Sequence, residues 1–254
     1  MSAATTDVAA SAIRCDGISM SFGPRAILRD ISLAVAPGTA YVLLGRSGTG
    51  KSVTLKLICG LLKPDSGTIH IGREDITRMD STELIPVRKG IGFVFQSSAL
   101  FDSISVGENV AFPLRRHTDK PDQEIRQRAQ NVLEQVGLGE EYNSMPSDLS
   151  GGMRKRAGLA RALALEPAIL LVDEPSAGLD PITSREIDEL LLTVKQKNHT
   201  TLVVVTHNIP SARVIADRLA FLDEGKIVAE GTAAELDHSE IQLVRDFMQS
   251  RQGG

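Results

Sequence analysis

The sequence predicts an α/β protein whose mostly parallel sheet follows antiparallel strands and is interrupted by a helical insertion. Three observations predict this class. Short apolar stretches separated by turn residues fill the segment 13–35, as in antiparallel strands. Strand-like runs disappear between residues 106 and 165, where helical patterns dominate. After residue 168 strands and helices alternate, which implies a parallel sheet flanked by helices.

Up to residue 95 the chain is expected to form strands and one helix. The turn residues Gly17 and Gly23-Pro24 divide the first antiparallel strands. Tyr41–Leu44 is an apolar run that ends in a glycine-rich loop, a pattern typical of a buried strand. The other elements expected here are a helix over 51–59, which ends before Gly60, and strands over 68–71 and 91–95.

Two helices are expected in the insertion. The amphipathic segment Pro121–Val136 starts at a proline and ends before a glycine, which predicts a helix. A second helix is expected from about Gly152 to Leu165. The alternating elements that follow are strands over 169–172, 202–205 and 219–222 and helices over 182–197 and 209–215.

The composition limits the class of protein. The 254 residues carry 28 Lys+Arg and 32 Asp+Glu, a formal net charge of -4, whereas dedicated nucleic-acid binders have a basic balance. Tryptophan is absent and aromatic residues make up 4% of the chain, which disfavours a stacking platform for single-stranded nucleic acid. We therefore expect no nucleic-acid partner.

The chain lacks the signals of secretion and of membrane insertion. Cys15 and Cys59 are too few for a disulfide framework and are expected to be reduced thiols. No apolar run reaches ~18 residues, the length typical of a transmembrane helix. Residues 1–10 lack the charged and apolar regions of a signal peptide. We expect a soluble, cytoplasmic protein whose membrane spans, if it acts at a membrane, belong to other chains.

A glycine-rich motif lies between the strand at 41–44 and the helix at 51–59. Its sequence GRSGTGKS matches G-x-x-x-x-G-K-[ST] in the strand–loop–helix context of a P-loop. The glycines let backbone N–H groups surround a phosphate, and the helix N-terminus adds partial positive charge. Lys51 is expected to reach the β- and γ-phosphates and Ser52 to hold Mg²⁺. The residues expected to bind ATP here are Gly45, Arg46, Ser47, Gly48, Thr49, Gly50, Lys51 and Ser52.

Two carboxylates end the apolar run 169–172. A buried strand would place Asp173 at its carboxyl end, beside the P-loop, where open α/β sheets bind ligands. Asp173 could then hold Mg²⁺ through water. Glu174 faces differently and could polarise the attacking water. The pattern alone is weak, because many strands end in acidic residues, and it gains its meaning from the P-loop.

Two further features carry less information alone. Ser150-Gly151-Gly152-Met153 precedes a helix, so it resembles a second phosphate nest, although a simple helix cap has the same appearance. His207 follows the strand at 202–205, where a lone histidine is more often a surface or core residue than a catalytic one. The five histidines and two cysteines show no metal-ligand spacing.

Taken in order, these motifs resemble the ATP-binding subunit of ABC transporters. The resemblance extends over 13–231, with the helical subdomain at about 97–165. Residues 1–12 are then a disordered tail, and 232–254 form a C-terminal helical extension that begins with capping-box spacing at Thr232 and Glu235. The motifs are Walker A at 45–52, the Q-loop at Gln96, the signature at 149–153, Walker B at 169–173, the D-loop at 176–180 and the switch His207.

The resemblance implies a set of roles. Glu174, His207 and Gln96 are the expected catalytic residues, and Ser52, Gln96 and Asp173 the expected Mg²⁺ ligands. Two copies meet head to tail, so that the signature of one copy contacts the ATP held by the P-loop of the other. The residues expected to act in this contact are Ser150, Gly151, Gly152, Met153 and, in the D-loop, Asp180. Transmembrane permease subunits are the implied partners, on the inner face of the cytoplasmic membrane.

Phe22 resembles the aromatic residue that stacks on adenine, although a strand-core role has the same pattern. The segments 95–110 and 149–163 resemble the ATPases of Mla/Mce-type phospholipid transporters, which implies lipid transport and a Mce-type lipid-binding subunit. Arg46 departs from the proline common at its place in Walker A. The alternative interpretation of the basic residues after the signature is a solvated helix face formed by Arg154, Lys155, Arg156 and Arg161.

The segment between the Q-loop and the first helix of the insertion is too apolar for a freely solvated loop. Its apolar residues could complete the core of the insertion or line a groove for a short helix of a membrane subunit. They are Ala99, Leu100, Phe101, Ile104 and Val106.

Three other functions compete with lipid transport. A small-solute ABC importer and a soluble ABC-type ATPase of iron–sulfur cluster assembly both stay open. A nucleic-acid ATPase of this family needs two cassettes or a long coiled coil within the cassette. The chain has one P-loop, and Gln96 lies only 53 positions before Leu149, which argues against that function.

Overall fold

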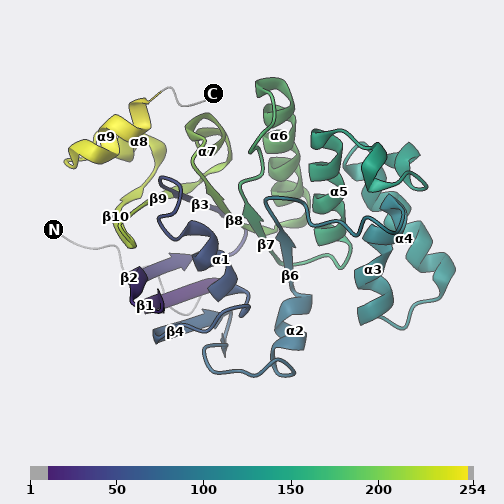
Figure 1. The fold of residues 1–254 in the computed structure, drawn as a ribbon, viewed down its shortest axis with the longest axis horizontal. Helices are drawn as coiled ribbons and strands as arrows, with labels where there is room; N and C mark the ends of the chain where they lie inside the picture. The colour runs from purple at the N-terminus through teal and green to yellow at the C-terminus, as the bar shows by residue number, and fades with distance from the viewer. Residues whose placement is uncertain (1–10, 251–254) are drawn as a thin grey trace.

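The computed structural model describes residues 11–250, which form two sheets with helices packed around them (Figure 1). The larger sheet has six strands in the order β10-β9-β3-β8-β7-β6. Its neighbours pair in parallel except β10 and β9, which pair antiparallel. The strands are β3 (Ala40–Leu44), β6 (Ile91–Val94), β7 (Ile169–Asp173), β8 (Thr201–Thr206), β9 (Arg218–Asp223) and β10 (Lys226–Gly231).

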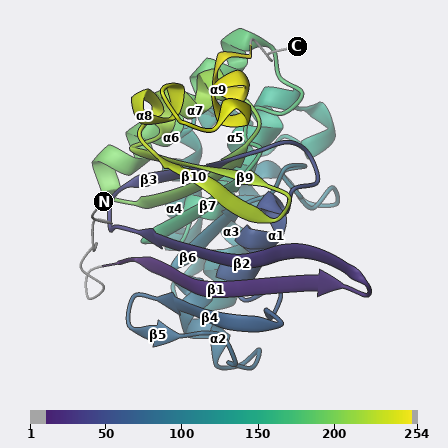
Figure 2. The ribbon, with the colours of Figure 1, turned by 90° about the vertical axis from the view of Figure 1, so that its left-hand side faces the viewer.

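The smaller sheet is antiparallel and has the order β2-β1-β4-β5. Figure 2 shows it beside the larger sheet, with β2 nearest to β9 and β10. A main-chain hydrogen bond of 2.8 Å from Arg29 to Gly225 joins β2 to the turn between β9 and β10. The strands are β1 (Ile13–Phe22), β2 (Arg25–Val35), β4 (Ser66–Ile71) and β5 (Glu74–Asp75).

Two groups of helices lie near opposite ends of the molecule. Figure 1 shows α3, α4 and α5 together at one end of the molecule and α8 and α9 near the other. The group between β6 and β7 consists of α3 (Val106–His117), α4 (Asp122–Gln135) and α5 (Gly151–Leu163), with short 3-10 turns at Gly139–Glu141 and Pro146–Asp148. The group near the other end consists of α8 (Ala233–Asp237) and α9 (Gln242–Gln249). The remaining helices are α1 (Lys51–Ile58), α2 (Leu84–Lys89), α6 (Pro181–Asn198) and α7 (Ile209–Ile215).

Successive residues of the central strands belong to two different hydrophobic cores. In β3, Val42 and Leu44 pack with the core that includes residues of α3 to α7, whereas Tyr41 and Leu43 pack with α1 and the smaller sheet. The side chains of a strand alternate between faces, so a sheet covered on both sides has apolar residues throughout. This explains why the central strands are continuous apolar runs in the sequence.

The predicted fold class is confirmed, with a parallel core, antiparallel strands before it and helices inserted between β6 and β7. The bounds of α7 agree with the prediction, and the capping box forms, with the Glu235 amide donating to the Thr232 hydroxyl. Within the described residues the insertion has three helices where two are predicted, because α3 is not predicted as a separate helix, and β5 is not predicted either. The sequence pattern also does not predict α2 or β10. Helix α2 has six residues and β10 is a half-exposed edge strand, so neither carries a clear period.

The structure does not test the predicted tail, the end of the predicted C-terminal extension or the predicted subdomain limits. The disordered tail predicted for residues 1–12 lies almost entirely outside the described residues, and so does the end of the predicted C-terminal extension. The subdomain limits at about 97–165 remain predictions. Between residues 11 and 250, no helix is both long and apolar enough to cross a membrane.

The interpretation of the basic residues of α5 as a solvated face is wrong. Lys155 is buried, and Arg156 and Arg161 are only partly exposed. The Arg161 guanidinium donates to the main-chain oxygens of Ser98 and Ala99. Arginine and lysine side chains often bury their stems and reach carbonyl oxygens with their charged ends. Only Arg154 of the four is exposed.

Asp188 of α6 is a buried carboxylate that the site does not use. Its Oδ1 atom has no hydrogen-bond partner, and burial raises its pKa from 3.8 to about 6, although the Ser211 hydroxyl opposes the shift. The folded protein therefore keeps the Asp188 proton at pH values where the unfolded chain has lost it. The contribution of Asp188 to the free energy of unfolding must then decrease as the pH rises from 3.8 through about 6.

We expect Asp188→Asn to stabilise the protein relative to the wild type near neutral pH, by about 1–3 kcal/mol, because it removes an uncompensated buried charge. The gain should shrink as the pH falls to about 4.5, where wild-type Asp188 is protonated. Urea unfolding at both pH values measures this. Asp119→Asn, at an exposed position, is the matched control. A gain that does not depend on pH would contradict the prediction.

Candidate active site

Strand order brings three functional segments together at one edge of the larger sheet. Strand β8 lies between β3 and β7, and all three are parallel, so their carboxyl ends are adjacent. The P-loop follows β3, Asp173 ends β7 with Glu174 next to it, and His207 follows β8. Ligands of open α/β sheets bind at this edge.

The P-loop backbone needs glycine for two different reasons. Gly50 has φ +111°, and a Cβ there would lie 2.5 Å from Leu28 Cδ2, so both backbone and packing exclude a side chain. A Cβ on Gly48 would meet no atom within 4 Å, and there the requirement is φ +81°. The Lys51 ammonium is buried inside the loop and donates to the carbonyl oxygens of Gly45 and Arg46 at 2.8 and 3.0 Å.

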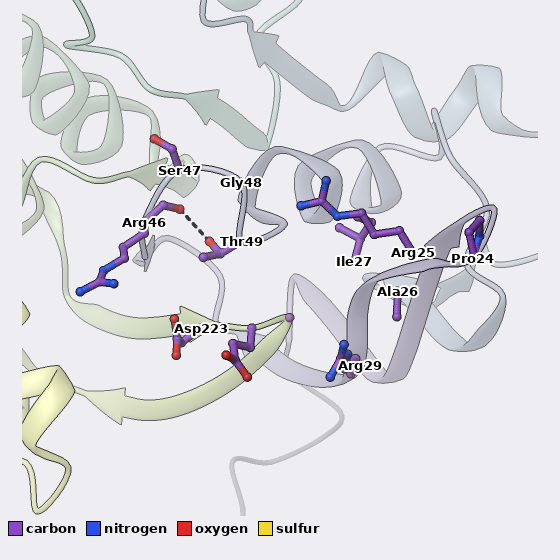
Figure 3. Close-up of a pocket in the computed structure, with 12 residues that line it drawn as sticks. Pro24, Arg25, Ala26, Ile27, Arg29, Arg46, Ser47, Gly48, Thr49 and Asp223 are labelled. Carbon is purple, nitrogen blue, oxygen red and sulfur yellow. Dashed lines mark hydrogen bonds between the residues drawn. The ribbon is translucent and has the colours of Figure 1, made fainter.

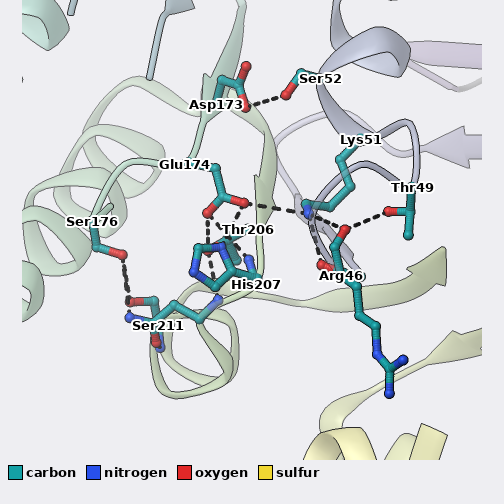
Figure 4. A network of polar contacts seen from close by, with 12 residues as sticks. Arg46, Thr49, Lys51, Ser52, Asp173, Glu174, Ser176, Thr206, His207 and Ser211 are labelled. Carbon is teal, nitrogen blue, oxygen red and sulfur yellow. Dashed lines mark hydrogen bonds and ion pairs between the residues drawn. The ribbon is translucent and has the colours of Figure 1, made fainter. Parts of the chain in front are cut away.

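Asp173 and Ser52 meet as the sequence predicts. The Ser52 hydroxyl donates to Asp173 Oδ1 at 2.9 Å (Figure 4). Asp173 is buried, and burial raises its pKa, although the Ser52 hydrogen bond opposes the shift. These oxygen atoms belong to the hard type of ligand that Mg²⁺ prefers, and Mg²⁺ commonly takes only one or two protein ligands beside phosphate and water.

The Glu174 carboxylate is the centre of the polar network in Figure 4. Its Oε1 lies 2.9 Å from His207 Nδ1 and 3.5 Å from the Lys51 ammonium. Its Oε2 accepts from the Thr206 hydroxyl at 3.1 Å and from the His207 amide at 3.3 Å. Burial lowers the pKa of Lys51, and the charge of Glu174 opposes that shift. The network thus joins residues from the carboxyl ends of β3, β7 and β8.

The P-loop opens onto a cavity of about 630 Å³ (Figure 3). The hairpin between β1 and β2 lines one side with Arg25 and Arg29, and the turn after β9 contributes Asp223. Phe22 lies next to this hairpin and is 50% exposed, so it is not a strand-core residue, although it does not line the cavity itself. Sequence reasoning missed Arg25 and Arg29, because nothing in the motif indicates which hairpin faces the P-loop.

The signature precedes α5 and Gln96 follows β6, and neither lines the cavity beside the P-loop. Ser150 is the N-cap of α5, and its hydroxyl accepts from the Met153 amide at 3.2 Å. A Cβ on Gly152 would lie 2.5 Å from Thr183 Cγ2 of α6, whereas Gly151 is exposed and has room around it. Among residues 11–250, no hydrogen bond joins 150–153 to the P-loop, so the structure does not bring these two nests together within one chain.

Gln96 and Asp180 are both exposed. The Gln96 main-chain oxygen accepts from Lys155, a contact that sequence reasoning missed. The Asp180 carboxylate caps α6, because its Oδ1 accepts from the amides of Ile182 and Thr183 at 3.0 Å each. The Thr183 hydroxyl also donates to the Asp180 carboxylate, and this hydrogen bond lowers the pKa of Asp180 the most, followed by those from the amides.

A second cavity, of about 380 Å³, lies between β6, α3 and α5. Phe101 and Phe112 line it and are both nearly half exposed, with ring centroids 4.9 Å apart. The interpretation as core holds for two residues of the apolar segment, while two others line a cavity whose binding of a membrane-subunit helix stays a prediction. Leu100 packs against the core and Val106 is buried within it, whereas Ala99 and Phe101 line the cavity.

The P-loop, the paired carboxylates beside it and the doubly covered sheet define an α/β nucleotide-binding ATPase. The sequence profile described as "ABC transporter" matches residues 28–177. A dimeric ATP-binding cassette in a post-hydrolysis state, bound to ADP and Pi, superimposes with a TM-score of 0.80 at 33% identity, over 87% of this chain and 98% of that one. The chain therefore belongs to the ABC transporter family and is an ATPase that binds ATP.

Curated relatives extend over most of the chain. The intermembrane phospholipid transport system ATP-binding protein MlaF of Haemophilus influenzae is 40% identical over 95% of this chain and 92% of its own. MlaF of Escherichia coli is 42% identical over 91% of this chain and 86% of its own. The probable ribonucleotide transport ATP-binding protein mkl of Mycobacterium leprae is 43% identical over 96% of this chain and 70% of its own.

Proposed function

We propose that this chain is the ATPase subunit of an ABC system that transports phospholipid in a bacterial envelope. The observation that carries the proposal is its similarity to MlaF, which continues over nearly the whole of both chains. The relative named for ribonucleotide transport favours a second function, transport of a nucleotide or another small solute. We give it less weight, because about a third of that relative has no counterpart here.

The residues at the carboxyl edge of the sheet divide the chemistry among them. Lys51 supplies a positive charge to the β- and γ-phosphates, and the P-loop amides hold the phosphate oxygens. Glu174 accepts a hydrogen bond from the attacking water and polarises it. His207, 2.9 Å from Glu174, orients that carboxylate and contacts the γ-phosphate side of the site. Phe22, next to the hairpin that lines the cavity beside the P-loop, would stack on the base.

Mg²⁺ fits the oxygen atoms at the end of β7. Ser52 and Asp173 already lie within hydrogen-bond distance of each other beside the P-loop, and Gln96 is exposed on the loop after β6. These three residues would hold the ion, and the ion would neutralise charge on the phosphates.

ABC cassettes act as dimers together with membrane permease subunits, and we propose a head-to-tail arrangement for this one. Residues 46–48 of the P-loop are exposed, and so is Gly151 at the N-terminus of α5, but no hydrogen bond between described residues joins the P-loop to 150–153. A second copy would bring its residues 150–153 and Asp180 to the ATP of the first. We place the helical subdomain at 97–165 and the ATP-binding domain at 13–231.

We further propose that the cavity between β6, α3 and α5 receives a short helix of the permease. Its exposed Phe101 and Phe112 offer apolar surface that a cytoplasmic protein would otherwise cover, and Arg88 and Arg161 add positive charge. The chain would then lie on the inner face of the cytoplasmic membrane. A Mce-type lipid-binding subunit would belong to the same complex.

Lys51→Ala and Glu174→Gln should separate ATP binding from hydrolysis. Lys51→Ala removes the charge on the phosphates, so ATP affinity should be lost. Glu174→Gln should keep ATP affinity but slow turnover by about 10²–10⁴-fold, or about 2.7–5.5 kcal/mol of barrier. Nucleotide titration and phosphate release measure the two effects. Lys56→Ala, at an exposed position of the same helix, is the control. Hydrolysis at the wild-type rate in Glu174→Gln would remove Glu174 from its role.

Mixed dimers test whether the site is shared between copies. With Lys51→Ala in one copy and Ser150→Arg in the other, both changes fall in one site and the second site stays whole. With both changes in one copy, each site carries one change. Affinity-tagged mixed dimers of the first kind should therefore hydrolyse more ATP than those of the second kind. Equal and substantial turnover in both would mean that each chain hydrolyses ATP alone.

Phe101→Asp should weaken binding to the permease, because it would bury an unpaired carboxylate at the contact. ATP binding should survive, since the P-loop is unchanged. Co-purification with the membrane subunits measures the effect. Leu61→Asp is the matched control, because Leu61 is also about half exposed but lies outside the cavity. Normal co-purification of a folded Phe101→Asp protein would argue against the groove.

Cells that lack the protein test the transported substrate. Loss of envelope lipid asymmetry would support phospholipid transport. An unchanged lipid distribution together with defective uptake of a nucleotide or other small solute would exclude it and leave the ATPase function intact.

A further inference from the structure

Lys155 of α5 is a buried lysine that lies between two functional loops. Lys155 is 8% exposed, so it is buried about as deeply as the side chains of Lys51 and Glu174, which are 6% and 10% exposed. Its ammonium donates to the main-chain oxygen of Gln96 and to that of Glu174, the latter at 3.2 Å. Within residues 11–250, no carboxylate oxygen lies within 4.0 Å of it. The charge of Lys155 is therefore satisfied by two carbonyl groups rather than by an ion pair.

The energetics of this contact favour a specific role over a packing role. Burial of an ammonium group is costly unless hydrogen bonds compensate for the lost water, and burial does lower the pKa of Lys155. An apolar side chain of similar length would fill the same space without that cost. The hydrogen bonds that retain the lysine join a residue after β6 to a residue after β7.

The Glu174 contact fixes an unusual backbone. Glu174 has φ +47°, in the left-handed region that residues other than glycine rarely adopt. Its amide donates to Val205 of β8 at 2.9 Å, and its carbonyl accepts from Lys155. Both polar groups of its main chain are thus held, one by the sheet and one by α5. The direction of the Glu174 side chain follows from this backbone.

The same helix holds the loop after β6 at further points. Arg161 donates to the main-chain oxygens of Ser98 and Ala99, which have φ +63° and +45°. A Cβ on Gly158 would lie 3.1 Å from Ser98 Cβ, so the loop packs closely on the helix. Residues 96–99 are therefore joined to α5 at several points, and Lys155 joins both to the residue after β7.

We propose that Lys155 is a positioning residue for ATP hydrolysis, whose ammonium joins the main chains of Gln96 and Glu174. The orientation of the Glu174 carboxylate then depends on where α5 lies, so that hydrolysis requires the helical insertion in one position. This inference rests on the proposed role of Glu174 in polarising water. Lys155 acts through Glu174 and does not itself contact ATP.

Steady-state hydrolysis and ATP titration of the full-length chain test the proposal. Lys155→Met should lower kcat by about 10- to 100-fold, the usual effect of losing a charged hydrogen bond, with ATP affinity and KM changed by less than about threefold. Lys155→Arg should recover most of kcat, because it keeps a charged donor. Lys120→Met, the same change at an exposed position of the insertion, is the matched control.

The double variant Lys155→Met/Glu174→Gln distinguishes positioning from an independent effect. If Lys155 acts through Glu174, the double variant should be no slower than Glu174→Gln alone. Multiplied losses would overturn the proposal, and so would equal losses in Lys155→Met and Lys155→Arg. Lys155→Gln, which keeps an uncharged donor, replaces Lys155→Met if thermal melting shows that the latter does not fold.

Failure of the inference and failure of the proposed function give different results. If Glu174→Gln is slow and Lys155→Met hydrolyses at the wild-type rate, the inference alone is overturned. The same holds if Lys155→Met loses ATP affinity and kcat together, because the lysine then only supports the fold. If Glu174→Gln hydrolyses at the wild-type rate, the role of Glu174 and the inference both fail.

Discussion

The buried Glu174 carboxylate is the constraint on which the rest of the site depends. A carboxylate removed from water needs charged or hydrogen-bonding partners, and Glu174 finds them in Lys51, Thr206 and His207. These partners follow β3 or end β8, the two strands nearest to β7 on one side. The strand order 3-8-7 therefore brings all three partners beside the carboxylate.

The apolar strands make that arrangement rigid. Each central strand packs alternate side chains into two cores, one containing the inserted helices and the other containing α1 and the antiparallel sheet. A shift of one strand by one residue would exchange the two sets of side chains and displace the polar residues at its carboxyl end. The same packing that stabilises the sheet thus fixes the positions of Lys51, Asp173 and His207 relative to one another.

The sequence predicts the parts of the site that depend on local pattern. The P-loop follows from glycine spacing, and the strands follow from apolar runs, so the meeting of Ser52 with Asp173 could be anticipated. The contacts of Lys155 and Arg161 could not, because a basic stretch on a helix has the same pattern whether it faces water or a neighbouring loop. Likewise Arg25 and Arg29 line the cavity beside the P-loop because β2 lies against the turn after β9. Such contacts depend on tertiary packing, which cannot be predicted from the spacing of residues in one segment.

Several residues with positive φ lie in loops that also could not be predicted from local sequence pattern. Glu174, Ser98 and Ala99 all have positive φ, and all three lie where a strand of the sheet passes into a loop held by α5. Strained residues persist only where surrounding contacts hold them. Here contacts from α5, which begins at the signature, hold all three residues, and β8 also holds the Glu174 amide. The geometry of these loops therefore depends on the position of α5 as well as on the sheet, whereas the P-loop has no such contact with that helix among the described residues.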